Sequence, residues 1–159
     1  MAVDVFMKID GISGESSDLQ YKDWIEVLSL NWEVTRPLDQ ASGKVIHVLK
    51  SSPFGIIKVV DKATPQIFKA VTSHEDIEEI QLALCRAGKE RVKYLGYVFK
   101  DCLITKAALQ MGNNSGESLP TEDIRFRFAS VEITYFQQKR DTGGSAGQIS
   151  HKWNFSEWS

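Results

Sequence analysis

Hydrophobic and polar residues alternate over much of this chain, and the alternation predicts β-strands. The longest example runs from Trp24 to Val34. Successive side chains of a strand point to opposite faces, so the apolar residues at even positions would share one buried face: Leu28, Leu30, Trp32 and Val34. The polar residues between them would face solvent. The pattern therefore predicts one long, half-buried strand.

Shorter alternating segments predict further strands on both sides of this one. They cover residues 3–9, 45–49, 56–60, 77–84, 92–99 and 102–109, with a last edge strand at 149–155. A turn at residues 87–90 separates two of them, which predicts a hairpin. Both faces of the returning arm, from Tyr94 to Phe99, are apolar. We expect this strand to lie under a helix, inside a closed barrel wall or against another subunit.

The apolar face changes position between residues 124 and 135. Apolar residues stand first at even positions and then at odd ones: Ile124, Phe126, Phe128, then Val131, Ile133 and Tyr135. Because the side-chain period of a strand is two, this change needs either an extra residue or a sharp bend. The sequence therefore predicts a β-bulge or a bend near Ala129 and Ser130.

One short α-helix is predicted at about residues 64–73. Residues 61–65 supply a polar capping residue with Pro65 next to it, and Pro65 suits a first helical position because its missing N–H would be unpaired there anyway. Ile67, Phe68 and Val71 would form one apolar stripe. A helix this short is unstable alone, so we expect it to dock on the sheet.

Residues 36–44 interrupt the strand pattern. They contain Pro37 and Gly43 and few residues that could pack in a core. We therefore expect an extended, projecting loop. The length of 159 residues suits one domain, 1–159, with a core of ordinary size.

The charge balance and the hydropathy pattern exclude two classes of partner. The chain has 19 Lys and Arg residues against 21 Asp and Glu residues, so it lacks the basic excess of a nucleic-acid binder. Its apolar stretches fall short of the roughly 20 residues of a membrane span, and its first residues do not resemble a secretory signal. We expect a cytosolic protein without membrane insertion, and any export would use a route that ignores N-terminal signals.

The residues that usually bind metals or cofactors are scattered. His47, His74 and His151 are far apart and do not have metal-ligand spacing, so no metal or cofactor is predicted. Cys85 and Cys102 lie inside strand-like segments, where we expect reduced, buried thiols. A disulfide between them would require neighbouring strands in register.

Catalytic motifs are also missing from the sequence, which lacks a Gly-x-Ser-x-Gly elbow and a phosphate-binding loop. The carboxylates between Glu75 and Glu79 are interpreted as a solvated face. Basic residues surround the predicted hairpin turn: Arg86, Lys89, Arg91 and Lys93. They would either protect the strand edges from unwanted pairing or bind an acidic neighbouring subunit.

The order of several short segments resembles one known family. The segments are residues 10–16 after the opening strand, 25–29 with Trp32, 61–65 before the helix, Gly88 between two strands, 128–131 leading to Tyr135, and Trp153-Asn154. Together they resemble the haemolysin-coregulated protein (Hcp) family, the tube protein of bacterial type VI secretion. The resemblance extends over nearly the whole chain.

The resemblance implies a mainly β fold, a small antiparallel β-barrel with one helix and an extended loop. It implies a hexameric ring that stacks into a tube, carries effectors in its lumen and works with a sheath and a tip spike protein. No catalytic residues come with the family, and the protein would be made in the bacterial cytoplasm and secreted through the type VI apparatus without a signal peptide. An alternative is a secreted monomeric β-barrel effector or ligand-binding module of the same fold; an enzyme ranks third.

The resemblance also indicates where copies of the chain would meet. The extended loop corresponds to the part that helps rings stack, which gives these candidates: Arg36, Pro37, Leu38, Asp39, Gln40, Ser42 and Lys44. The two-sided strand and the basic turn give the candidates for contact between subunits of a ring: Tyr97, Phe99, Arg86, Lys89 and Arg91.

Overall fold

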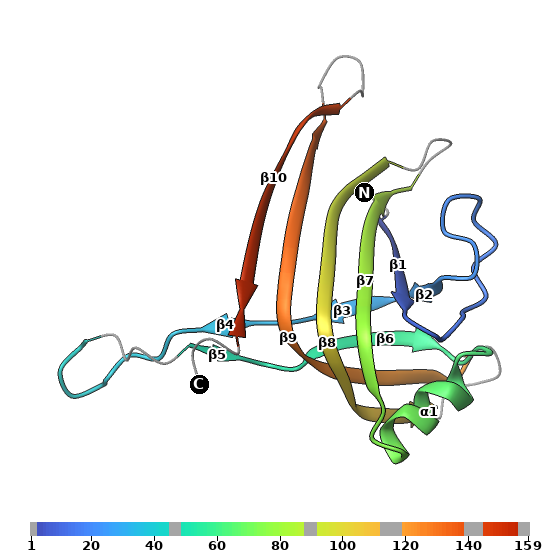
Figure 1. Ribbon diagram of the computed structural model, residues 1–159, viewed down its shortest axis with the longest axis horizontal. Helices are drawn as coiled ribbons and strands as arrows, with labels where there is room; N and C mark the ends of the chain where they lie inside the picture. Colours follow the sequence, from blue (N-terminus) through green and yellow to red (C-terminus); the bar gives the residue numbers. More distant parts are fainter. Residues whose placement is uncertain (1–2, 45–48, 88–91, 112–118, 139–144, 156–159) are drawn as a thin grey trace.

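The computed structural model describes residues 3–44, 49–87, 92–111, 119–138 and 145–155. Ten strands and one helix occur in this part of the chain: β1 Val3–Ile9, β2 Ile25–Val27, β3 Ser29–Asn31, β4 Val34–Thr35, β5 Lys50–Ser51, β6 Phe54–Val59, α1 Thr64–Thr72, β7 Asp76–Arg86, β8 Val92–Gln110, β9 Thr121–Gln138 and β10 Ser145–Asn154. The predicted mainly β fold with one short helix is confirmed (Figure 1).

One antiparallel sheet forms a nearly closed barrel. Its strand order is β2-β1-β7-β8-β9-β6-β3, and β10 pairs with β9 beside this path. The two ends of the order, β2 and β3, follow one another directly in the sequence. Leu28, between them, donates its N–H to the carbonyl of Ile57 in β6 at 2.8 Å. The chain itself therefore joins the two edges of the sheet, which protects them from pairing with other proteins.

The segment from Trp24 to Val34 differs from its prediction. It forms three short strands instead of one, because β2 pairs with β1 while β3 pairs with β6. Ile25 and Val27 face the core, and Leu28 at the junction is 60% exposed. The predicted common face of Leu28 and Val34 is therefore wrong, since the chain changes its pairing partner at Leu28.

The strands β8 and β9 are long and continuous, so the prediction of a separate strand at 102–109 is wrong. The predicted change of face near Ala129 is confirmed: Phe128 and Val131 both pack on the same core. It occurs without an inserted residue, since Lys100 pairs with Ser130 and Cys102 with Phe128. Figure 1 shows both strands curving sharply.

Asp101 lies at this change of face. Its φ of 53° is in the left-handed region, and it is missing from the ladders with β7 and with β9. Before Asp101 the inward side chain of β8 is that of Phe99, and after Asp101 it is that of Cys102. One left-handed residue therefore resets the alternation, whereas the register shift between β8 and β9 lies between Ile104 and Lys106.

The helix α1 lies at one end of the barrel and contacts β8 (Figure 1). Ala63, Ile67 and Ala70 are fully buried at a spacing of three to four residues, and Val71 packs beside them. Phe68 is 61% exposed, so its assignment to the apolar stripe is wrong. Phe68 follows Ile67 by one residue, so helical geometry turns its side chain away from the buried face that Ile67 and Ala70 share.

Aromatic rings fill the middle of the barrel. Phe54, Phe99 and Phe126 are fully buried, and their ring centroids lie 4.9 to 5.4 Å apart. Phe128 and Trp32 are partly buried at the rim of this group, 5.8 Å from each other. The centre therefore carries most of the apolar burial, and the rim contributes less.

Phe126→Ala is expected to lower the free energy of unfolding by about 3–5 kcal/mol, because it leaves a cavity among buried rings. Phe128→Ala should cost clearly less, because its ring is only partly buried. Denaturant unfolding of both variants at the same protein concentration measures the difference. An equal loss for the two variants would contradict this view of the core.

Candidate functional site

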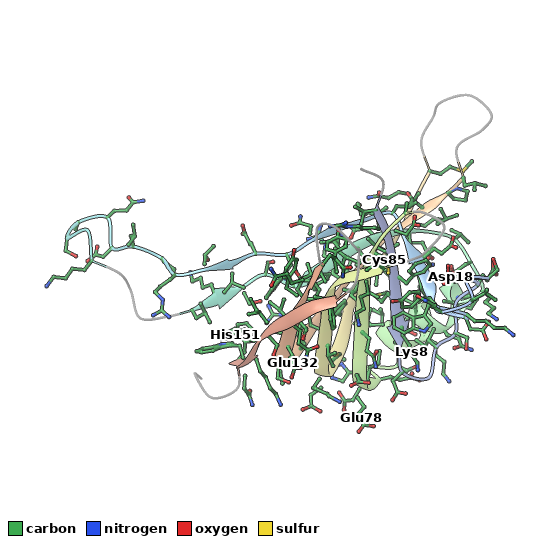
Figure 2. All side chains as sticks on the ribbon, turned by 90° about the horizontal axis from the view of Figure 1, so that it is seen from above. Lys8, Asp18, Glu78, Cys85, Glu132 and His151 are labelled. Atoms are coloured by element: carbon green, nitrogen blue, oxygen red, sulfur yellow. The ribbon has the colours of Figure 1, made fainter. Side chains whose placement is uncertain are left out.

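The residues predicted to form a loop at 36–44 project from the barrel as the tip of an arm (Figures 1 and 2). The base of the arm is the β4–β5 pair, in which Val34 faces Ser51. Trp32 donates its Nε1–H to the Ser51 hydroxyl at 2.9 Å, while its ring packs on the core. The core therefore fixes the direction of the arm.

A hydrogen-bonded turn organises the tip of the arm. Asp39 accepts hydrogen bonds from the Ala41 N–H at 3.0 Å and from the Ser42 hydroxyl at 2.9 Å. Its backbone N–H donates to the Lys44 carbonyl, and its carbonyl accepts from the Gly43 N–H. Gly43 has a φ of 70°, which favours glycine. The tip is therefore a defined turn, although its side chains are in solvent.

These contacts also affect the charge of the tip. The hydrogen bonds from Ala41 and then Ser42 hold the pKa of Asp39 below its usual value. The turn therefore keeps its ionised acceptor until the pH falls through that lowered pKa. Leu38 beside it is 60% exposed, which leaves an apolar side chain at the tip without cover from the barrel.

The predicted subunit-contact residues do not form one surface. Tyr97 is half-buried and faces its own core, 5.8 Å from the Phe54 ring, and this burial raises its pKa. Phe99 is fully buried within its own chain. Its side chain cannot contact another subunit, so that prediction is wrong: the register places Phe99 on the inward face. Arg86 is exposed and stays a candidate, whereas Lys89 and Arg91 lie outside the described residues.

A surface that the sequence analysis did not identify lies on β10. This strand of 10 residues pairs only with β9 in the part of the chain that the structure describes. Ile149 stands opposite Tyr135 in the register; they are 69% and 45% exposed. Both lie on the face that packs on the core farther along, where Val131 stands opposite Trp153. At Ile149 and Tyr135 this apolar face therefore extends past the residues that pack on the core.

Groups that could carry chemistry remain separate. Cys85 and Cys102 are both buried, as the sequence predicts, and burial raises the pKa of Cys102 to about 12. His74 and His151 are exposed, and His47 lies outside the described residues. No group of three potential metal ligands occurs among the residues that the structure describes. Those residues also include no helix long and apolar enough to cross a membrane.

A buried charged cluster fixes the start of α1. Lys58 on β6 has a fully buried side chain, and its Nζ lies 2.9 Å from Asp61 Oδ1 and 2.5 Å from Glu122 Oε2. Thr64 donates its hydroxyl to the same Glu122 oxygen at 3.0 Å, and Asp61 accepts the Ala63 N–H. The cluster connects two strands with the first turn of the helix, which is a structural task.

A family model agrees with this geometry. The model described as "Type VI secretion system effector, Hcp" matches residues 6–135, which is most of the chain. The match begins within β1 and ends within β9, so it includes the helix α1 and the arm.

Individual relatives extend over nearly the full length. Protein hcp1 of Pseudomonas aeruginosa is 29% identical over 160 residues, with 99% of this chain and 98% of the relative covered. The crystal structure of Hcp1 from Salmonella typhimurium is 29% identical and has a TM-score of 0.80, with 100% of this chain and 99% of that one covered. A type VI secretion system effector from Yersinia pestis is 32% identical with a TM-score of 0.76, and the match covers 95% of this chain and 99% of that one.

Lys58→Met is expected to lower the free energy of unfolding by about 3–5 kcal/mol, because it leaves the buried carboxylate of Glu122 and the partly buried one of Asp61 without their cation. The matched control is Lys106→Met, which removes a partly exposed pair with Asp123 and should cost less than about 1 kcal/mol. Chemical denaturation measures both. Similar losses in the two variants would show that the buried cluster does not hold the helix.

Proposed function

Because this chain belongs to the Hcp family of type VI secretion proteins, we propose that it is a tube subunit whose copies close into a hexameric ring. Rings stack into a tube, and the lumen carries effector proteins. The whole chain, 1–159, acts as one such domain. Its task is assembly, and it catalyses no reaction.

The exposed face and edge of β10 carry this proposal. A strand of 10 residues that pairs along one edge only, as β10 does among the described residues, is a template for pairing with another chain. Natural proteins usually protect such an edge with charges or proline. Between Ser145 and Asn154 the charged side chain is Lys152, and there is no proline. Ile149 and Tyr135 add exposed apolar surface beside the edge. A contact between copies would bury both.

Closure into a ring is the arrangement that satisfies every copy. The edge of β10 differs from the rest of the surface, so a contact between β10 and another part of a second copy is heterologous. Repeated heterologous contacts produce either a closed ring or an open filament. A closed ring leaves no β10 edge free, which also explains how the chain avoids aggregation.

The geometry of the arm is consistent with a role in stacking the rings. Its base is held to the barrel through Trp32 and Ser51, and its tip points away from the barrel (Figure 1). A segment with a defined turn and an exposed Leu38 would gain from a partner beyond its own chain. We therefore keep the stacking role for residues 36–44.

The remaining partners follow from the family and are part of the proposal. They are a sheath around the tube, a spike protein at its tip and effectors inside it. The chain would be made in the bacterial cytoplasm and leave through the type VI apparatus without a signal peptide.

Native mass spectrometry with negative-stain electron microscopy tests the ring. We expect hexamers and uniform annular particles for the purified full chain. A single-chain mass at micromolar concentration would overturn the ring and favour a monomeric effector or ligand-binding module with the same fold.

Ile149→Lys is expected to convert rings into smaller species, because it places a charge in the apolar contact. Ile149 is 69% exposed in one chain, so the variant should keep its fold. The control Gln66→Lys adds the same charge at an exposed position of α1 and should leave rings intact. Sedimentation velocity separates these outcomes; intact rings for both variants would exclude Ile149 from the interface.

Deletion of residues 39–42 is expected to preserve rings and weaken their stacking, since it removes the turn at the tip and leaves the barrel unchanged. Electron microscopy at increasing protein concentration compares the lengths of stacks. Loss of the rings themselves, with single chains in native mass spectra, would show that the arm has another role.

A further inference from the structure

A groove of about 470 Å³ lies on the outer side of the barrel where β3, β6 and β9 run side by side. Its lining includes Asn31, Pro53, Gly55, Ile57 and Arg125. The two residues of β6, Gly55 and Ile57, lie in the middle of the groove by register, with β3 on one side and β9 on the other.

Gly55 creates the hollow. It pairs with Asn31 on one side and with Arg125 on the other, so one cross-strand row has no side chain at its centre. A Cβ atom at this position would lie 3.6 Å from the Asn31 carbonyl oxygen and 3.8 Å from Arg125 Cγ, which are ordinary contacts. An alanine would therefore fit here without a close contact. Its own barrel therefore does not require a glycine at position 55. A glycine inside a strand often marks a site where another backbone approaches closely.

The groove combines an apolar centre with charges of both signs. Ile57 and Pro53 give it apolar surface, and Glu33 lies at the end nearest the arm. On the other wall Arg125 donates to Asp123 at 3.3 Å, and the Arg125 side chain stays 47% exposed. Burial raises the pKa of Asp123, but the hydrogen bonds from Arg125 and Lys106 outweigh it and leave the pKa low. The wall therefore presents a fixed ion pair.

The tip of the arm has the matching features. Leu38 is an exposed apolar side chain. The backbone hydrogen bond from the Asp39 N–H to the Lys44 carbonyl places Leu38 and the basic residue Lys44 in the same turn. The arm points away from its own barrel in both views, so its tip is not placed to fill its own groove (Figures 1 and 2). An occupant of this kind has to come from a second copy.

We propose that the groove around Gly55 receives the arm tip of a second copy of this chain, with Leu38 over Ile57 and Lys44 toward Glu33. Asp39 is a positioning residue, since it holds the turn that presents Leu38. This contact rests on the proposed function, in which rings stack, and it names the surface that the arm binds.

Disulfide trapping between separate chains tests the contact. Leu38→Cys and Asn31→Cys are made in different chains, mixed and oxidised mildly; the wild-type chain, whose two cysteines are buried, reports the background. We expect a covalent dimer in which position 38 of one copy is linked to position 31 of the other, as peptide mass spectrometry identifies. The control mixes Leu38→Cys with Ser73→Cys, an exposed position at the end of α1, and should give no such link.

Filling the groove gives a second, independent test. Gly55→Val is expected to fold, since a Cβ at this position meets only ordinary contacts and valine suits a strand. It should weaken stacking by about tenfold or more in apparent affinity while rings persist. Lys8→Val places the same side chain at an exposed position of β1 and should leave stacking unchanged. Thermal unfolding confirms that both variants are folded.

The outcomes separate this contact from the proposed function. If wild-type rings stack but the link between positions 38 and 31 is missing and Gly55→Val stacks normally, the groove is not the receptor and the ring proposal stands. If the wild-type chain forms no rings, both proposals are overturned. A link together with weakened stacking supports both.

Discussion

The strands β8 and β9 contain 19 and 18 residues, and each has to cover one apolar face along its whole length. A straight strand of this length would extend past any small barrel. Because its side chains alternate strictly, it would also keep the same set of side chains inward along its whole length. The left-handed residue Asp101 and the face change at Ala129 solve part of this problem by bending both strands around the core. The remainder of β9 keeps its pairing with β8 as far as Tyr135 and pairs with β10 along its other edge. The shape of the subunit follows from these two facts.

The same constraint explains why the chain has one closed and one open side. Consecutive strands β2 and β3 close the barrel at Leu28, so the edges there are protected by the chain itself. No comparable closure exists at β10 in the described part of the chain, where Ile149 and Tyr135 stay exposed. A monomer with this design leaves apolar surface and backbone hydrogen-bonding groups uncovered, and an assembly can cover them.

Local patterns predicted some elements well. The strand β1 and the helix α1 have the expected bounds, because alternation and the Pro65 start are local signals. The projecting arm was predictable for the same reason. The apolar phase of residues 124–135 even predicted a change of face near Ala129, since it reports directly on which side chains are inward.

Features that depend on distant partners could not be predicted in the same way. Leu28 alternates correctly with Leu30, yet the change from β1 to β6 as pairing partner exposes it. Phe99 was assigned to an interface because both faces of its strand are apolar, and only the register shows that it faces inward. The hollow at Gly55 needs β3 and β9 on either side of it, which a single segment cannot reveal.

Hydrogen–deuterium exchange of residues 145–154 shows whether assembly covers the edge of β10. We expect the outer-edge amides of β10 to exchange slowly in the assembled protein and much faster after dilution to single chains, while amides of β7 in the barrel wall change little. Equally fast exchange of those β10 amides in the assembled and the diluted protein would contradict this expectation, since the edge would then be in contact with water in both states.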